Sequence, residues 1–373
     1  MNWKIEGLKR LDGIIGKLAC SLARASISPR RDITSRGRKI LVIRPGGIGD
    51  AALLYPALRG LREGFRDAEI NILAEKRNAG ILKGCPYING VFLYDLRPPS
   101  ELLNVLRTSY DMVIDTEQWH RLTAVASYLT KAPIRVGFRT NERAELFTHP
   151  VSYRHDEYEV YSFLNLVSAI TGEKYDFDES KPFIPLDPNL VSIICSSVLE
   201  FRKKWSAIVG VFTGATVPER RWGVGNFAGV SKELSKEGIG TVIVGGNGEF
   251  EDVSEFEGIV GRENVLNFVG KTSLMETAAV LSQVDLFITG DTGLMHVAYG
   301  VGTPTVSLFG AGIQKKWAPI GKNHIAINKN LLCSPCTRFG YTPKCPYDVK
   351  CLNDIAVGEV KESALRLLAQ SRK

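Results

Sequence analysis

Short apolar runs alternate with helically periodic stretches along most of the chain. The runs 40–44 and 69–73 have the length and the β-branched content of buried strands, and residues 51–61 between them repeat their apolar positions at helical spacing. Continuous apolar runs are typical of parallel strands that helices cover on both faces. The same pattern predicts further strands in this half of the chain at 90–94, 111–115 and 135–138, with helices between them.

A second series of strands and helices begins after residues 176–189, a segment rich in Asp, Pro and Lys that we interpret as a linker. Beyond it the pattern predicts strands at 208–212, 241–244, 265–268, 286–289 and 305–309, and helices at 191–205, 226–236, 250–258, 274–282, 294–299 and 357–368. This alternation builds doubly wound α/β domains. We therefore predict two Rossmann-like domains facing across a cleft, at 39–185 and 186–373, with an N-terminal tail at 1–38.

The turn after the strand 286–289 is the first candidate site. Gly290-Asp-Thr-Gly293 follows the strand, a helix is predicted directly after it, and His296 lies one turn further on. Ligands of doubly wound sheets bind at the carboxyl ends of the strands, and the amides at a helix start favour phosphate. Asp291 and Thr292 are also residue types that cap helices without any further role, and the local sequence leaves both interpretations open.

A glycine-rich turn follows the first strand. Pro45-Gly-Gly-Ile-Gly-Asp50 has neither the G-x-G-x-x-G spacing of dinucleotide-binding turns nor the Gly-Lys-Ser/Thr ending of a Walker loop. Its glycines add little bulk, so that a ligand can approach the backbone closely. Asp50, at the start of the next helix, is a candidate site residue, and simple N-capping is the alternative.

Two further strand ends in the second half carry polar residues. The turn after the strand 208–212 contains Thr216 and leads to Arg220 and Arg221, which suit phosphate. The turn after the next strand contains Gly245, Gly246 and Glu249. Because the carboxyl ends of parallel strands share one edge of a sheet, we expect these turns to meet the Asp291 turn. Such an arrangement suits a nucleotide diphosphate.

The composition is ordinary, but the charge is unevenly placed. A hydrophobic content of 44% and a charged content of 23% are typical of soluble globular proteins. Residues 1–39 hold ten Lys or Arg and three acidic residues, which accounts for the whole formal net charge of +7. A nucleic-acid enzyme usually spreads basic charge over its working surface, so we expect no nucleic-acid partner.

The basic tail has an amphipathic pattern. In residues 3–24 the apolar side chains fall in one arc of a helical wheel, roughly 140° wide, opposite basic residues. No run reaches the ~18 apolar residues of a membrane span, and the apolar core of a signal peptide is missing. The helix either lies in an anionic membrane surface or packs on the globular body. We expect a cytoplasmic protein, peripheral on the inner face of the inner membrane in the first case.

Four cysteines cluster within residues 333–351, at Cys333, Cys336, Cys345 and Cys351. Their spacing is compatible with a four-thiolate zinc or iron–sulfur site. The alternatives are a structural clamp, made by a disulfide or by packed free thiols, and a redox role, although disulfide frameworks are less expected in the cytosol. Any metal at the cluster is expected to be structural, and none is expected to be required for catalysis.

In this order and spacing, the motifs resemble glycosyltransferase family 9, the heptosyltransferases of lipopolysaccharide core assembly. The resemblance runs from residue 39 to about 360 and rests on the segments 40–50, 214–222, 244–246, 269–274 and 290–296. It implies the GT-B fold, with the acceptor bound mainly by the first domain and a nucleotide sugar by the second. It also implies an inverting transfer without an essential metal.

The resemblance assigns roles to some of the candidate residues, and we expect the other candidates to line the same sites. Asp50 is similar to the general base of the family, and Arg220 falls where many members have a Lys that neutralises the diphosphate. Gly46 and Gly47 would line the acceptor site. The donor site would comprise Thr216, Arg221, Gly245, Gly246, Glu249, Asp291, Thr292, Gly293 and His296. These roles suit the reaction, because inverting transfer needs a base for the acceptor hydroxyl and positive charge at the leaving diphosphate.

We therefore expect an enzyme that moves a sugar, heptose from ADP-heptose or a sugar from another nucleotide, to a lipopolysaccharide-core or related lipid-linked saccharide. One alternative is a non-catalytic protein that binds nucleotide sugars or serves as a scaffold on the same fold. A binding protein would not need a base on the opposite domain. The other alternative is a nicotinamide-dependent oxidoreductase, which the glycine spacing disfavours.

Overall fold

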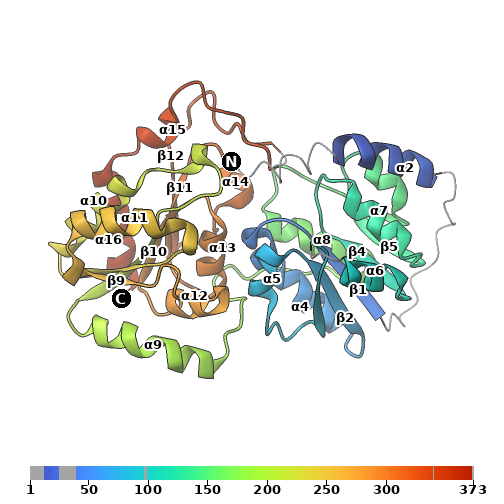
Figure 1. Ribbon diagram of the computed structural model, residues 1–373, viewed down its shortest axis with the longest axis horizontal. Coiled ribbons are helices and arrows are strands. Elements are labelled where there is room, and N and C mark those ends of the chain that lie inside the picture. The colour runs from blue at the N-terminus through green and yellow to red at the C-terminus, as the bar shows by residue number, and fades with distance from the viewer. Residues whose placement is uncertain (1–11, 25–38, 96–98, 339, 372–373) are drawn as a thin grey trace. The chain divides into compact units, whose positions relative to one another are not determined.

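The computed structural model describes residues 12–24, 39–95, 99–338 and 340–371. The chain divides into two compact units, 1–177 and 178–373, each built on a six-stranded parallel sheet with helices on both faces (Figure 1). The division lies before the boundary expected at 185/186. The reason is that the backbone N–H groups of Phe183 and Ile184 both donate to Gly300 O, at 2.8 and 2.9 Å, so this part of the linker belongs to the second unit.

The sheet of unit 1 has the strand order β3-β2-β1-β4-β5-β6. Its strands are β1 (Lys39–Arg44), β2 (Glu69–Ala74), β3 (Gly90–Leu93), β4 (Met112–Asp115), β5 (Ile134–Arg139) and β6 (His149–Ser152). β1 pairs in parallel with β2 on one side and with β4 on the other. The winding direction therefore reverses between β1 and β4, and in doubly wound sheets this switch point is where ligands bind.

The helices of unit 1 follow the predicted alternation. They are α3 (Ile48–Leu53), α4 (Tyr55–Gly64), α5 (Lys76–Leu82), α6 (Ser100–Arg107), α7 (Leu122–Leu129) and α8 (Glu159–Thr171), with the short 3₁₀ helix η2 (Glu142–Leu146). The helical stretch expected at 51–61 is divided between α3 and α4 at Leu54. Pro56 lies in the first turn of α4, where its missing N–H has no helical partner to lose.

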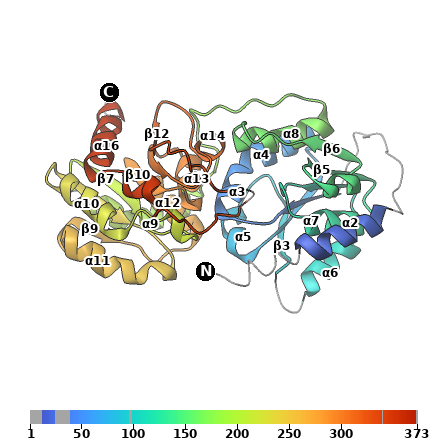
Figure 2. The same ribbon diagram turned by 90° about the horizontal axis from the view of Figure 1, so that it is seen from above.

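The described part of the N-terminal tail packs on unit 1. Residues 3–11 of the predicted helix lie outside the described residues, whereas η1 (Asp12–Gly16) and α2 (Lys17–Arg24) lie beside α7 (Figure 2). Cys20 is fully buried against Ala124, Leu146 and Phe147. The carboxylate of Asp12 accepts hydrogen bonds from the backbone N–H groups at 121 and 122, both at 2.8 Å.

The tail also leaves an apolar stripe exposed. Ile15, Leu18 and Leu22 are 48%, 62% and 77% exposed, on a different face from Asp12 and Cys20. Packing on the body therefore uses small and polar residues and leaves Ile15, Leu18 and Leu22 uncovered. Among the described residues, no helix has the length and apolar character needed to cross a membrane.

The sheet of unit 2 repeats the topology of unit 1, with the order β12-β11-β10-β7-β8-β9. Its strands are β7 (Ala207–Phe212), β8 (Ile239–Ile243), β9 (Val265–Asn267), β10 (Leu286–Gly290), β11 (Thr305–Phe309) and β12 (His324–Asn328). Its longer helices are α9 (Pro188–Arg202), α10 (Val224–Ser235), α11 (Phe250–Val260), α12 (Leu274–Leu281), α13 (Gly293–Gly300) and α16 (Val357–Ser371). Two short helices are α14 (Gln314–Trp317) and α15 (Lys350–Asn353). The switch point lies between β7 and β10.

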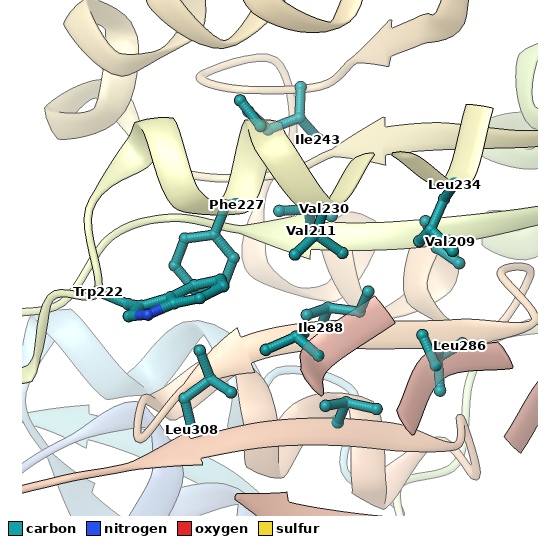
Figure 3. Close-up of a cluster of buried hydrophobic side chains, with 14 of the residues drawn as sticks. Val209, Val211, Trp222, Phe227, Val230, Leu234, Ile243, Leu286, Ile288 and Leu308 are labelled. Atoms are coloured by element: carbon teal, nitrogen blue, oxygen red, sulfur yellow. The ribbon is translucent and has the colours of Figure 1, made fainter. Parts of the chain in front are cut away.

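The hydrophobic core of unit 2 extends to this switch point. Apolar side chains of β7, β10 and β11 pack against α10, and Trp222 lies at the edge of this cluster (Figure 3). Trp222 is 2% exposed, stacks edge-on against Phe227 at 5.0 Å between ring centroids, and donates from Nε1 to Ile355 O at 3.2 Å. The buried indole fixes the chain directly after Arg220 and Arg221.

Candidate active site

Asp50 lies at the switch point of unit 1, in the first turn of α3. The N-cap of α3 is Gly47, so the capping alternative for Asp50 is wrong. Its Oδ1 instead accepts from Gln118 Nε2 at 3.1 Å and lies 3.9 Å from Arg44 Nη1. Its Oδ2 faces the glycine turn, where a methyl group placed on Gly47 would come within 3.3 Å of it.

Arg44 supplies a fixed positive charge beside Asp50 Oδ1. It is the last residue of β1 and is 1% exposed. Its Nη1 donates to Thr116 O at 3.0 Å, its Nη2 lies 3.5 Å from Glu117 Oε2, and its guanidinium lies over the Phe163 ring at 5.5 Å. A buried cation needs paired charges and hydrogen bonds of this kind to remain charged.

Glu117 organises the chain after β4. Its Oε1 accepts from the backbone N–H groups of Trp119 and His120, at 3.0 and 3.2 Å. Burial alone would raise the pKa of Glu117, but His120 and the nearby arginines outweigh burial and hold that pKa below its usual value. The carboxylate therefore stays ionised and keeps Arg44 paired.

The glycine turn is held in a conformation that requires glycine. Gly46 has a φ of +94°, a region that side chains disfavour, and its N–H donates to Glu75 Oε1 at 3.1 Å. The side chain of Asn78 donates to Arg44 O at 3.1 Å. Gly46 and Gly47 therefore form a fixed, low-bulk surface beside Asp50 Oδ2.

In unit 2 the strand order β10-β7-β8 places the three predicted turns side by side. Arg220 Nη1 lies 3.1 Å from Asp291 Oδ2, and Asp291 is only 7% exposed. Arg220 Nη2 donates to Thr337 Oγ1 at 3.4 Å, while its Nε makes no hydrogen bond within the described residues. The guanidinium is thus held at the switch point, and its Nε–H has no acceptor within the described residues.

The helix that follows Asp291 begins without a side-chain cap. Thr292 is the N-cap residue of α13, but in the described structure its side chain makes no cap hydrogen bond, and its Oγ1 lies 3.3 Å from Thr289 Oγ1. Capping by Asp291 or Thr292 therefore does not explain this turn. The start of α13 at Gly293 keeps the amide donors that favour an anion. His296 is buried in the same helix, with its ring stacked edge-on against Trp317 at 6.1 Å.

Glu249 joins the turns after β7 and β8. It accepts from Gly246 N at 2.9 Å, and a methyl group on Gly214 would lie 2.6 Å from its Oε1. Burial, assisted by the nearby Asp252 carboxylate, raises the pKa of Glu249. Arg221 Nε donates to Ala215 O at 3.1 Å, which shapes the loop that exposes Thr216. Gly245 packs under Glu249, with its Cβ position 3.3 Å from the Glu249 Cβ.

The cysteine cluster lies next to the same edge of the sheet. The backbone N–H groups of Cys336 and Thr337 donate to Ala311 O at 3.1 and 2.9 Å, and Cys351 Sγ lies 2.8 Å from the Cβ position of Gly310. In the structure all four cysteines of the cluster are free thiols. Among the described residues, no group of three or more His, Cys, Asp or Glu is arranged to hold a metal ion.

Three side chains around Asp50 were not predicted from the sequence, namely Arg44, Glu117 and Gln118. A signal was present, because all three lie at or just beyond the carboxyl ends of β1 and β4. The reversal of the strand order between these strands makes their ends the place where polar side chains converge. The sequence alone does not give that order.

Comparison with known proteins agrees with this architecture. A family model described as glycosyltransferase family 9 (heptosyltransferase) matches residues 101–345. The lipooligosaccharide heptosyltransferase 2 of Campylobacter jejuni is 23% identical over 350 residues, covering 89% of this chain and 99% of that protein. The lipopolysaccharide heptosyltransferase 3 of Escherichia coli is 25% identical over 306 residues, covering 74% of this chain and 85% of the other.

Solved structures show the same fold. The ADP-heptose lipopolysaccharide heptosyltransferase II of Escherichia coli superposes with a TM-score of 0.72 at 22% identity, covering 90% of this chain and all of that one. A family 9 glycosyltransferase of Veillonella parvula gives the same TM-score at 21% identity, covering 92% of this chain and 100% of the other. The GT-B fold expected from the sequence is confirmed. Since the family model also spans more than half of the chain, the protein belongs to glycosyltransferase family 9.

Proposed function

We propose that the protein is an inverting heptosyltransferase that takes ADP-heptose as donor and a lipopolysaccharide-core or related lipid-linked saccharide as acceptor. The observation that carries the proposal is the Arg220–Asp291 pair at the switch point of unit 2, beside the uncapped start of α13. A cation and helix amides at one strand edge suit a diphosphate. The choice of sugar and nucleotide is supported by the names of the relatives, which are heptosyltransferases.

In the proposed reaction Asp50 accepts the proton of the acceptor hydroxyl. The acceptor oxygen then forms a bond to the anomeric carbon on the face opposite the leaving group. The bond between that carbon and the diphosphate oxygen breaks, and ADP leaves with the electron pair. One displacement of this kind inverts the anomeric configuration.

Arg220 and the amides at the start of α13 stabilise the negative charge that develops on the diphosphate. Because these groups supply positive charge at that position, we propose that transfer needs no metal. Activity should therefore persist after treatment with EDTA, and its loss with recovery on adding a divalent cation would refute metal independence.

The function is tested by direct assay. Purified protein is incubated with a deacylated core saccharide and each of a panel of nucleotide sugars, and the product is analysed by mass spectrometry and by NMR of the anomeric proton. Transfer of heptose with inversion supports the proposal. Donor binding without turnover on any acceptor would favour the non-catalytic alternative. In that case a thermal-shift measurement still reports donor binding, since ligand at 100 times its Kd adds about 2.7 kcal/mol to the stability of the folded state.

Replacing Arg220 with Ala is expected to weaken ADP binding by roughly 10- to 150-fold, because hydrogen bonds to charged groups contribute about 1.5–3 kcal/mol. Adenosine, which has no diphosphate, should bind nearly as before. Calorimetry with both ligands measures the difference. Arg202→Ala is a matched control, because Arg202 pairs with Asp285 in the same unit at the amino end of β10. An equal loss for ADP and adenosine would place Arg220 outside the diphosphate site.

We also propose that the tail holds the enzyme on an anionic membrane at the inner face of the inner membrane, where a lipid-linked acceptor would lie. The exposed stripe of Ile15, Leu18 and Leu22 supports this, since such side chains are stabilised in the lipid interface. The charge of the sequence supports it as well, because residues 1–39 carry all of the net positive charge.

Changing Leu18 and Leu22 together to Ser should weaken binding to phosphatidylglycerol vesicles, measured by cosedimentation, by about 100-fold or more, given roughly 1.5–3 kcal/mol for each buried leucine. Turnover of a water-soluble acceptor should not change. The matched control is Ile193→Ser with Leu199→Ser on α9, because these side chains are 74% and 52% exposed on another helix. Equal sedimentation of the two double variants would refute docking through the tail.

A further inference from the structure

The amide of Gln118 connects two carboxylates in unit 1. Its Nε2 donates to Asp50 Oδ1 at 3.1 Å and to Glu159 Oε1 at 2.7 Å. A side-chain amide nitrogen carries two hydrogens, and both are used here. The rotation of the amide about its last torsion is therefore fixed by these two acceptors.

Glu159 is itself firmly held. It is the first residue of α8 and is 0% exposed, and its Oε2 accepts from Tyr153 OH at 3.0 Å. Burial first, and then the carboxylates of Glu159 and Asp50, raise the pKa of Tyr153. The hydroxyl therefore keeps its proton and donates a hydrogen bond to Glu159. The Tyr153 ring in turn packs edge-on against Phe138 of β5, with 4.9 Å between the centroids. A chain of directed hydrogen bonds thus runs from Tyr153 to Asp50.

This chain distinguishes the two oxygens of Asp50. Oδ1 lies near both the Gln118 amide and Arg44. Oδ2 lies 3.3 and 3.9 Å from the Cβ positions of Gly47 and Gly46, on the side of the low-bulk turn. Within the described residues, no hydrogen bond is formed to Oδ2. A general base needs one oxygen aimed at the substrate, and the arrangement leaves Oδ2 for that task.

We propose that Gln118 is a positioning residue for Asp50, that Glu159 orients Gln118, and that Asp50 Oδ2 is therefore the oxygen that removes the acceptor proton. The inference rests on the proposed function, because it takes Asp50 as the base. Neither Gln118 nor Glu159 touches the reacting atoms. Both act through the carboxylate that they hold.

The charges around Asp50 determine how each change should affect the pH dependence. Arg44 and the Gln118 N–H lie beside Asp50 Oδ1, and the Glu159 carboxylate lies on the other side of the Gln118 amide. Neighbouring segments contribute two more carboxylates, Glu117 after β4 and Glu75 after β2. A positive charge or a hydrogen-bond donor near a carboxyl group favours its ionised form, and a negative charge opposes it. His120, next to Glu117, adds positive charge when protonated. Removing the amide and removing the Glu159 charge should therefore move the acidic limb of the rate profile in opposite directions.

The experiment measures kcat/KM against pH for the full-length enzyme and its variants. Gln118→Met removes the donor and should move the midpoint of the acidic limb up by about one pH unit, given the usual worth of a hydrogen bond to an ionised group. It should also lower kcat by roughly 10- to 100-fold, as loss of alignment does, with an unchanged Kd for the donor. Glu159→Gln keeps a hydrogen-bond acceptor but not the charge, and should move the midpoint down.

The controls separate positioning from general damage. Gln283→Met removes a half-buried amide of unit 2 that donates to Ser282 Oγ, and should leave the midpoint unchanged. If Gln118→Met does not fold, Gln118→Glu keeps the size and adds a further carboxylate beside Asp50, which should move the midpoint up. An unmoved limb, or a shift in the same direction for Gln118 and Glu159 variants, would overturn the positioning role. Absence of transfer by the wild-type enzyme with every donor would overturn the proposed function instead.

Discussion

Replacing Asp50 with Asn is expected to lower kcat by about 10²–10⁴-fold, the usual worth of general base catalysis, and to leave the affinity for the donor nearly unchanged. The amide oxygen of Asn can still accept from Gln118, so the local geometry should be preserved. What is lost is the basic oxygen that faces Gly47. Steady-state kinetics give kcat, and calorimetry with ADP gives the donor affinity.

The matched variant is Asp291→Asn. Asp291 is paired with Arg220 at the switch point of unit 2, where we propose that the donor binds, so this change should mainly weaken donor binding. The two carboxylates are thus expected to have separable effects, one on turnover and one on affinity. If Asp50→Asn turns over at nearly the wild-type rate while Asp291→Asn is inactive with donor bound, the two roles are reversed.

Most of the fold could be predicted because its buried strands are continuous apolar runs. The two strands that the sequence did not predict, β6 and β12, lie at the edges of the two sheets. β6 is the segment His149-Pro-Val-Ser152, and β12 is only partly buried along most of its length. An edge strand pairs on one side only and needs fewer apolar residues, so the hydrophobic pattern of β6 and β12 is weak.

The candidate site could be predicted only in part. Glycine turns and polar residues at strand ends are local features, and they pointed to Asp50, Arg220 and Asp291. The partners of Asp50 are not local, because Gln118 comes from another strand end and Glu159 from a helix start further along the chain. A polar contact of this kind depends on strand order and on the path of the backbone, neither of which is visible in hydrophobic periodicity.

The tail shows a similar limit of sequence patterns. The helical wheel left two alternative partners for one apolar arc, namely a membrane surface and the globular body. In the structure, Asp12, Gly16 and Cys20 form a separate, small and polar stripe that packs on unit 1. A hydrophobic pattern counts such residues as solvent-facing, although a backbone-bonded carboxylate and a buried thiol can make a tight contact.

Replacing Arg143 with Met is expected to lower the free energy of unfolding by about 3–5 kcal/mol, because it leaves a buried charge without its partner. Arg143 and Asp115 are both fully buried, and Arg143 Nη2 lies 2.6 Å from Asp115 Oδ2. Nη1 of Arg143 also donates to Glu117 O, the backbone of the loop that carries Gln118. Chemical denaturation followed by circular dichroism measures the loss.

The pH dependence of this loss identifies its cause. Burial raises the pKa of Asp115 and Arg143 opposes the rise, so removing Arg143 should move the folded-state pKa further above the unfolded value. An acid with a raised folded-state pKa favours the folded state at low pH and loses that contribution as the pH rises. The loss in free energy of unfolding caused by Arg143→Met should therefore be largest at neutral pH. It should shrink toward pH ~4, near the unfolded pKa of Asp.

Two controls test this explanation. Arg135→Met removes a buried guanidinium that donates to the carbonyls of Ala132 and Leu146, at 2.6 and 2.9 Å, and leaves no carboxylate behind. It should lower the free energy of unfolding by less than Arg143→Met does, and this loss should show no comparable pH dependence. Adding Asp115→Asn to Arg143→Met removes the stranded charge, while the Asn oxygen can still accept from the Glu117 N–H. The double variant should be more stable at pH 7 than Arg143→Met alone, and a further loss of stability would show that packing, not charge, makes Arg143 necessary.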